Sequence, residues 1–260
     1  MLKKFLSSMS GLMLLLATVF QSPGAFASVD SVLVWGTGTS QSNVDGVAAW
    51  IKSVGGFTTV DSVVNGTQTL ANLSNYDAVL FFSNSSGSSN SSNGNVLADY
   101  ADTGARLVLT TFSWANQGNN TLGGRIVSDA LSPYEYSGGS LYSNATMQSN
   151  DGSDFFTSVS AVGGYYRDAV ILTTGAVSHG TWSDGRSLLA SKDNVVGVNL
   201  FPDDAYGQLS GDYRQLFVNA LSAGSDEDGD GYTVSDGDCD DDDAAINPAA
   251  DEECDGVDND

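Results

Sequence analysis

The chain has 260 residues, with 9 basic and 32 acidic side chains, a formal net charge of −23 and 41% hydrophobic residues. This length and apolar content suffice for a buried core, and they exclude collagen-like and wholly disordered classes. The acidic excess excludes duplex nucleic acid and anionic lipid as main partners, because nothing supplies the cationic surface that binds phosphates.

The first residues have the layout of a secretory signal peptide. Lys3 and Lys4 form a basic start, residues 12–20 are apolar, and small residues at positions 25 and 27 precede a cleavage site before Ser28. The apolar stretch is too short for a transmembrane helix, and no later segment is apolar for 18 residues, so we expect no membrane span. We predict that residues 1–27 are removed and that the protein is secreted to the exterior or cell surface, with the periplasm as the alternative.

Residues 30–222 predict one α/β domain. Its first half contains apolar runs of strand length at residues 31–35, 78–82 and 106–110, and a β-branched, strand-like stretch at 58–64. Between these runs, apolar residues recur at helical spacing over 44–51 and 96–101, and glycines end both stretches. Short apolar strands that alternate with amphipathic helices indicate a mainly parallel sheet with helices on both faces.

The second half of this domain is less regular. Residues 132–168 are rich in Ser, Gly, Asn and Tyr, and they predict a hairpin or a long excursion beside the sheet. Three further strands are predicted at residues 169–174, 187–191 and 195–201. A closing helix over residues 209–220 is predicted to start at Ser210 and Asp212, since a hydroxyl can cap a helix and an acid suits its first turn.

A polar run of Ser, Asn and Gly at residues 83–95 follows a predicted strand. It predicts an exposed loop at the carboxyl end of that strand, the edge where open α/β sheets bind ligands. A solvated connection without a ligand is the alternative. Trp35, Trp50 and Trp114 are predicted as core or rim residues, with stacking on a sugar as their alternative role.

The order of elements over residues 31–221, together with the stretches 96–109 and 196–202, resembles the class I glutamine amidotransferase-like fold, a flavodoxin-type sheet. The enzymes of that family carry a nucleophilic Cys in a Gly-x-Cys-x-Gly turn, with His and Glu as partners. No Cys lies between Ser28 and Cys239, and the turn at residues 111–115 contains no glycine. The resemblance therefore implies a member without amidotransferase chemistry.

Ser113 and His179 are the candidate catalytic residues of an alternative, hydrolytic function. His179 is the only His of the chain, so a Ser–His hydrolase would need it, with Asp184 or Asp168 as the orienting acid. Ser113 lies where the nucleophile turn of the family falls, although the glycines of that turn are missing. Gln41 replaces the third glycine of a dinucleotide-binding turn, so we expect no organic cofactor.

The acidic tail predicts a calcium site. Residues 226–260 hold 16 of the 32 acids and no Lys or Arg, which gives the tail a charge of −16 and the preceding chain −7. Carboxylates at positions 1, 3 and 5 and a Gly at position 6 match a calcium loop, and oxygen-only ligands favour Ca²⁺ over copper. The closing acid is Asp236 or Asp238, because Gly237 occupies position 12. The candidate metal ligands are Asp226, Asp228, Asp230, Tyr232, Asp236, Asp238, Asp240 and Asp242. A disordered solubilising tail is the alternative.

Residues 238–260 resemble the metal-binding repeat named after a copper-binding surface protein of methane-oxidising bacteria, and also the calcium-wrapped aspartate repeats of thrombospondins. Such repeats are frequent in large secreted proteins of myxobacteria. The pattern normally continues with a further Cys, so the resemblance implies that the chain is truncated after Asp260. Cys239 and Cys254 can close a disulfide around the acidic loop, with pairing to the missing Cys as the competing arrangement.

These observations favour a secreted, non-catalytic binding or surface-adhesion protein that consists of an α/β domain and a calcium-binding tail. Divalent cations are the expected partners of the tail, and a cell-surface glycan or protein is the expected partner of the domain. Two alternatives remain open: a secreted Ser-dependent hydrolase that uses Ser113 and His179, and a structural surface-layer component with the tail as a metal-stiffened spacer.

Overall fold

The structure, a computed structural model, describes residues 26–27, 29–84, 90–115, 121–206, 208–226 and 245–250. Within these residues, ten strands form one mixed sheet in the order β11-β7-β6-β8-β9-β10-β5-β4-β2-β3. A separate two-residue parallel pair joins β1 (Phe26–Ala27) to β12 (Ser225–Asp226). Residues 26 and 27 precede the predicted cleavage site, so a chain that begins at Ser28 lacks this pair.

One half of the sheet is parallel and contains every strand predicted for the first half of the domain. Its strands are β10 (Val195–Val198), β5 (Arg106–Thr110), β4 (Ala78–Ser83), β2 (Ser31–Thr37) and β3 (Thr59–Val64). All residues of β4, β5 and β10 are buried, as expected for strands that are covered on both faces. The predicted α/β fold class is confirmed.

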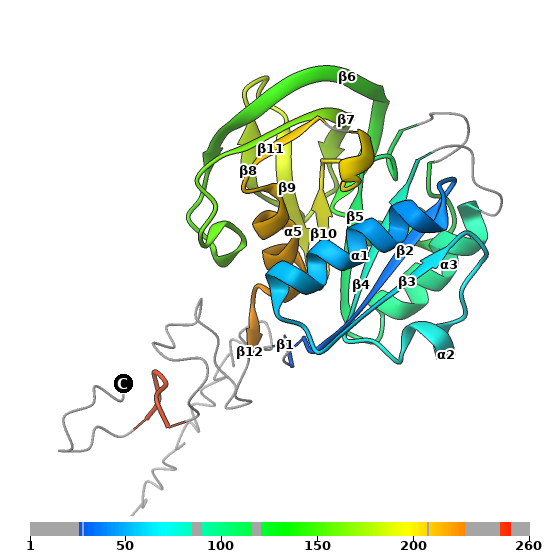
Figure 1. The fold of residues 1–260 in the computed structure, drawn as a ribbon, viewed down its shortest axis with the longest axis vertical. Helices are drawn as coiled ribbons and strands as arrows, with labels where there is room; N and C mark the ends of the chain where they lie inside the picture. Colours follow the sequence, from blue (N-terminus) through cyan, green and yellow to red (C-terminus); the bar gives the residue numbers. More distant parts are fainter. Residues whose placement is uncertain are drawn as a thin grey trace, which may run out of the picture.

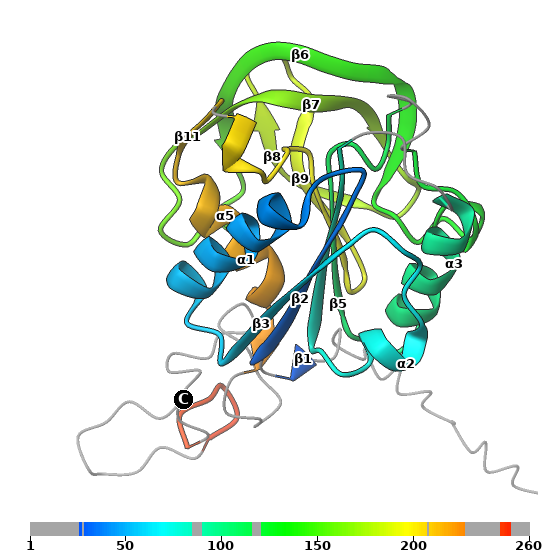
Figure 2. The same ribbon diagram turned by 45° about the vertical axis from the view of Figure 1, so that its right-hand side comes forward.

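The other half of the sheet is antiparallel. Its strands are β9 (Ser187–Lys192), β8 (Val177–Trp182), β6 (Tyr134–Asn150), β7 (Val162–Leu172) and β11 (Leu209–Gly211). The long β6 and β7 form the predicted hairpin and arch over the end of the sheet where β2, β4 and β5 finish (Figures 1 and 2). The strand predicted at 169–174 is the end of β7, so it belongs to this hairpin and is not a separate element.

Helices cover both faces of the parallel half. They are α1 (Gln41–Gly55), α2 (Leu70–Leu73), α3 (Asn90–Ala101), α4 (Arg125–Ser128) and α5 (Tyr213–Ser222), with 3₁₀ turns η1 (Asp154–Phe156) and η2 (Asp204–Tyr206). Figure 2 shows α1 and α5 on one side of the sheet and α2 and α3 on the other. The predicted end of α1 is confirmed, because Gly56 follows it with a φ of 69°, a left-handed conformation that glycine adopts without strain.

The predicted start of the closing helix is wrong. Ser210 lies in β11 and pairs with Gly163 of β7, so its backbone belongs to the sheet. The helix α5 begins at Tyr213, and its N-cap Asp212 makes no side-chain cap bond. The Asp212 carboxylate instead accepts hydrogen bonds from the backbone and hydroxyl of Ser160, each at 2.8 Å.

Two hydrophobic cores fill the space between the sheet and its helices. Trp50 of α1 packs against Phe217 of α5 on one face, with ring centroids 5.9 Å apart. Trp35 packs edge-on against Phe81 on the other face, at 5.1 Å. The core placement of Trp35, Trp50 and Trp114 is confirmed, because each is at most 6% exposed. No helix within the described segments is long and apolar enough to cross a membrane.

Candidate functional site

A cavity of about 390 Å³ lies beside the carboxyl end of β5. We call it the β5 pocket. It is lined by the end of β5, the turn that follows, a segment leading into α4, and the start of β6. The lining residues are Leu109, Ser113, Trp114, Thr121, Leu122, Ile126, Val127, Ser132, Tyr134, Glu135 and Tyr136. The pocket therefore occupies the position where the amidotransferase resemblance places a nucleophile.

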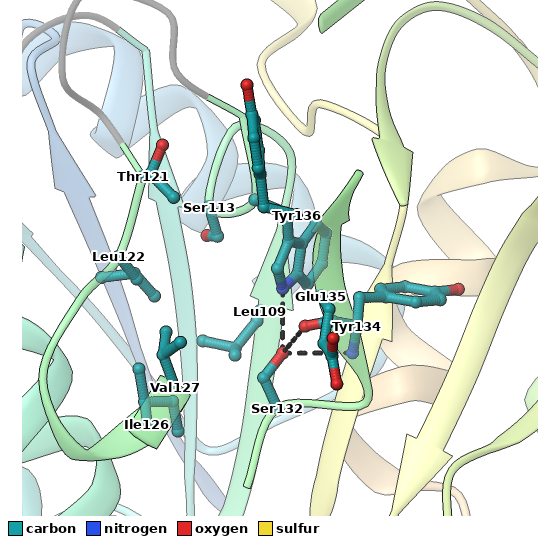
Figure 3. A pocket seen from close by; sticks show the side chains of 11 residues that line it. Leu109, Ser113, Thr121, Leu122, Ile126, Val127, Ser132, Tyr134, Glu135 and Tyr136 are labelled. Atoms are coloured by element: carbon teal, nitrogen blue, oxygen red, sulfur yellow. Dashed lines mark hydrogen bonds between the residues drawn. The ribbon is translucent and has the colours of Figure 1, made fainter. Parts of the chain in front are cut away.

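The walls of the β5 pocket are apolar at the base and polar at the rim. Leu109, Leu122 and Ile126 are buried, whereas the Tyr136 side chain is 52% exposed. Figure 3 shows Thr121 and Tyr136 at one end of the pocket and Glu135 near Ser132. Such an arrangement suits a ligand that combines an apolar surface with hydroxyl or amino groups.

A hydrogen-bonded group fixes one wall of the β5 pocket. The indole Nε1–H of Trp114 donates to Ser132 Oγ at 2.9 Å, and the Ser132 hydroxyl donates to the carbonyl of Tyr134 at 2.8 Å (Figure 3). The Trp114 and Tyr134 rings also pack edge to face, with centroids 4.9 Å apart. These contacts hold the turn after β5 against the start of β6, so this wall is preformed.

Two buried hydroxyls of the lining lack hydrogen-bond partners among the described residues. Ser113 is 1% exposed and its Oγ has no partner there, and Thr121 Oγ1 is buried without one as well. A buried polar group left unpaired costs about 1–3 kcal/mol. Within the same residues no base contacts Ser113 Oγ, so nothing in this part of the chain activates the hydroxyl as a nucleophile.

A buried polar network supports the turn from behind. The side chain of Asn199 accepts hydrogen bonds from Thr111 Oγ1 at 3.2 Å and from the backbone N–H of Asp168 at 2.7 Å. Its amide group donates to the carbonyls of Asp168 at 3.0 Å and Ser187 at 3.2 Å. The Trp114 backbone N–H donates to the Asp168 carboxyl at 3.3 Å. Burial raises the pKa of Asp168 well above its usual value, and the N–H of Trp114 offsets this only in part.

A second, smaller hollow of about 90 Å³ is bordered by Phe112 of the same turn. Its lining is mostly aromatic and consists of Asn84, Phe112, Tyr166, Phe201 and Tyr206. Asn84 donates a hydrogen bond to the Tyr206 hydroxyl and directly follows β4. Both cavities therefore lie at the carboxyl edge of the parallel strands, where open α/β sheets bind ligands. Residues 85–89 of the predicted polar loop lie outside the described residues. The loop prediction is wrong for residues 90–95, because they form the first part of α3, where Asn93 and Gly94 are buried.

The structure does not bring Ser113 and His179 together. His179 belongs to β8, and β9 and β10 separate β8 from β5, which amounts to three strand spacings or about 14 Å. Asp184 is bound to Arg167 at 2.7 Å and to Arg186 at 3.1 Å, so it does not orient the imidazole. His179 instead contacts Asp151 and Ser191. The triad predicted from Ser113, His179 and Asp184 therefore has no geometric basis.

The predicted metal ligands fall almost entirely outside the described residues. The backbone of Asp226 forms part of β12, while the other candidate ligands and both cysteines lie in 227–244 and 251–260. Within the part of the chain that the structure describes, no cluster of three or more His, Cys, Asp or Glu side chains could hold a metal. The calcium site and the disulfide stay predictions.

The fold is shared with solved α/β proteins. A GMP synthase subunit protein from Thermoplasma acidophilum is 12% identical, with a TM-score of 0.52, 74% of this chain covered and 92% of that one. A cytoplasmic protein from Salmonella typhimurium is 10% identical, with a TM-score of 0.53 and 73% and 97% covered. No family model and no curated protein matches the chain. At such identities the similarity establishes an amidotransferase-like fold.

Sequence reasoning missed most of the pocket. It identified Ser113 by its place after a strand, and Trp114 as a core or rim residue. It gave no role to Glu135 or Tyr136, because their segment has no apolar period and its polar side chains look like those of any exposed hairpin. Asn199 fell inside a predicted strand, and its buried amide has no sequence signature.

Proposed function

We propose that this chain is a secreted binding protein whose α/β domain holds a cell-surface glycan in the β5 pocket and whose tail, residues 226–260, binds calcium. The observation that carries the proposal is the preformed pocket at the carboxyl edge of the sheet, which has an exposed aromatic ring at its rim and, among the described residues, no activated nucleophile. The role of the pocket is therefore recognition without catalysis.

The chemistry of the β5 pocket matches that of a sugar. A sugar ring has an apolar C–H face that packs on an aromatic ring, and Tyr136, at 52% exposure, offers such a ring. Its hydroxyls both donate and accept, and they can satisfy the buried hydroxyls of Ser113 and Thr121 and the carboxylate of Glu135. The volume of about 390 Å³ lies within the usual range for small-ligand sites.

Charge narrows the class of glycan. Glu135 is the one lining residue with a charged side chain in the described part of the pocket, and the whole chain carries a net charge of −23. Sulfated or uronic sugars would be repelled both by the protein field and by this carboxylate. Neutral sugars and amino sugars are the favoured ligands.

A glycan-binding screen of the mature protein, followed by calorimetry on the best hit, tests the proposal. We expect Tyr136→Ala to weaken binding about tenfold or more, since an aromatic contact of about 1.4 kcal/mol corresponds to a factor of ten. Tyr142→Ala is the matched control, because Tyr142 is 46% exposed on the same strand and does not line the pocket. Absence of any glycan ligand, or a loss of binding caused by Tyr142→Ala and not by Tyr136→Ala, contradicts the proposal.

A further inference from the structure

Ser191, His179 and Asp151 form a hydrogen-bonded chain on the antiparallel half of the sheet. The Ser191 Oγ lies 2.7 Å from His179 Nε2, and His179 Nδ1 lies 2.7 Å from Asp151 Oδ2. With the ring proton on Nδ1, the imidazole donates to the carboxylate and accepts from the serine hydroxyl. This is the order of contacts that activates a serine nucleophile.

Each member of this chain is fixed by the fold. Asp151 directly follows β6, His179 lies in β8 and Ser191 in β9, three consecutive neighbours in the sheet. The backbone N–H of Asp151 donates to the carbonyl of His179 at 2.9 Å, which ties the acid to the strand of the base. The Phe155 ring packs on the imidazole, with centroids 4.8 Å apart. The imidazole is therefore held in one orientation.

The carboxylate of Asp151 is also held in place, so that one of its oxygens accepts a hydrogen bond from the imidazole. The backbone N–H and the hydroxyl of Ser153 both donate to Asp151 Oδ1, at 3.1 and 2.6 Å, which leaves Oδ2 to His179. Partial burial acts to raise the pKa of Asp151, but the hydrogen bonds from Ser153 and His179 outweigh it and hold the pKa below its usual value. An ionised Asp151 stabilises the imidazolium that forms when the serine loses its proton.

This site is partly exposed to solvent, and Ser191 itself is half-buried. The His179 side chain is 14% exposed and that of Asp151 is 40% exposed. Val177 stands directly opposite Ser191 in the β8–β9 ladder and is 55% exposed, so an apolar side chain borders the nucleophile. An acyl chain can lie on this surface while its carbonyl carbon meets Ser191 Oγ.

We propose that Ser191 is a nucleophilic serine that accepts acyl groups from small activated esters, with His179 as its general base and Asp151 as the positioning residue. Ser191 Oγ attacks the carbonyl carbon, its proton passes to His179 Nε2, and the leaving alcohol takes that proton as its bond to carbon breaks. Water, deprotonated by the same imidazole, then releases the acid and restores the serine. The site is separate from the β5 pocket, so the proposal is independent of glycan binding.

The expected rate is modest. Ser191 lies in β9, which is paired on both sides, with β8 and β10. The backbone N–H groups of this strand therefore take part in the sheet and are not available to stabilise an oxyanion. Loss of an oxyanion donor typically lowers turnover by about 10²–10³-fold. We therefore expect slow turnover with accumulation of acyl-serine, and preference for substrates with good leaving groups.

A fluorophosphonate probe tests this reactivity, because Ser191 Oγ would displace fluoride from phosphorus while His179 takes the proton. Intact mass and peptide mapping of the mature protein should show one adduct, on Ser191. Ser191→Ala should abolish it, and His179→Gln should slow it about 100-fold or more. Asp151→Asn should also slow it, and Asp151→Glu should restore part of the rate, which a purely structural role for the acid would not produce.

Ser149→Ala is the matched control. Its hydroxyl shares a hydrogen bond of 2.7 Å with Thr181 Oγ1 between β6 and β8, whereas the two imidazole nitrogens contact Asp151 and Ser191. This variant should label at the wild-type rate. The proposal is overturned if the wild-type protein stays unlabelled, if Ser191→Ala labels normally, or if His179→Gln labels as fast as wild type, since the last result would mark Ser191 as merely exposed.

Discussion

Replacement of Asn199 by Ala should destabilise the domain strongly, because one buried amide closes an edge of the sheet. In a strand, the N–H and C=O of one residue point the same way, so the Asp168 groups that meet Asn199 do not pair with β6. The amide of Asn199 bonds both of them, at 2.7 and 3.0 Å, and also meets Thr111 and Ser187. The Asn199 side chain thus makes the two hydrogen bonds to Asp168 that a neighbouring strand would otherwise make at this position of β7.

The size of the effect follows from these contacts. Asn199 is 0% exposed, and its loss leaves the N–H and C=O of Asp168 buried without their partner. Each such group costs about 1–3 kcal/mol, while the Thr111 hydroxyl can rotate to another acceptor. We expect the free energy of unfolding to fall by about 3–5 kcal/mol in Asn199→Ala.

Urea unfolding of wild type, Asn199→Ala and a control variant measures the change in the free energy of unfolding, which follows from the midpoint and slope of each transition. Asn194→Ala is the matched control, because its amide also donates twice, to the carbonyls of Ala101 and Ala105 at 2.8 and 2.6 Å, but from a partly exposed position where water can replace it. It should cost about 1 kcal/mol. A loss below about 1 kcal/mol in Asn199→Ala, or one no larger than in Asn194→Ala, would refute the reasoning.

Three further predictions concern the buried acid, the missing nucleophile and the tail. Burial raises the folded-state pKa of Asp168, so the wild type loses stability as pH rises above the unfolded-state pKa. The free energy of unfolding of Asp168→Asn, measured in urea, should therefore increase relative to that of wild type between pH 4 and pH 8. A difference that stays constant over this range would contradict the prediction. The purified protein should release no ammonia from glutamine, because the domain has no Cys to act as nucleophile; release that a point change within residues 28–222 abolishes would contradict this. Calcium should protect residues 226–260 from protease and bind with a dissociation constant of about 10⁻⁴–10⁻³ M. Combined Asp228→Ala and Asp230→Ala changes should reduce the calorimetric stoichiometry; an unchanged value would place the ion elsewhere in the tail.

The parallel half of the sheet could be predicted from the sequence because its elements are locally determined. β4 and β5 are continuous apolar runs, and α1 shows its core face as Val44, Val47, Ala48 and Ile51, all of them buried. The spacing of apolar residues and the glycines at the ends of elements therefore suffice to predict helices and strands whose buried face is regular.

The hairpin of β6 and β7 and the strand β9 were predicted, but β8, the pairing of the antiparallel half and the sites could not be, because tertiary contacts decide them. β8 contains Ser, His, Gly and Thr, which give no apolar pattern, and it forms only because β6 and β9 flank it. Asp151 lies 28 positions before His179, in a segment without any motif, so nothing in the sequence links this acid to the histidine. The hydrolase alternative chose Ser113 by analogy with a family turn, whereas the strand order places Ser191 beside the imidazole.

The most direct measurement of the central claim is an X-ray structure of the mature protein soaked with the tightest-binding glycan. We predict a sugar ring in the β5 pocket, packed on Tyr136 and hydrogen-bonded to Glu135. A sugar bound instead at the aromatic hollow formed by Phe112, Tyr166 and Tyr206, or at the acidic tail with the β5 pocket unchanged, would contradict this prediction.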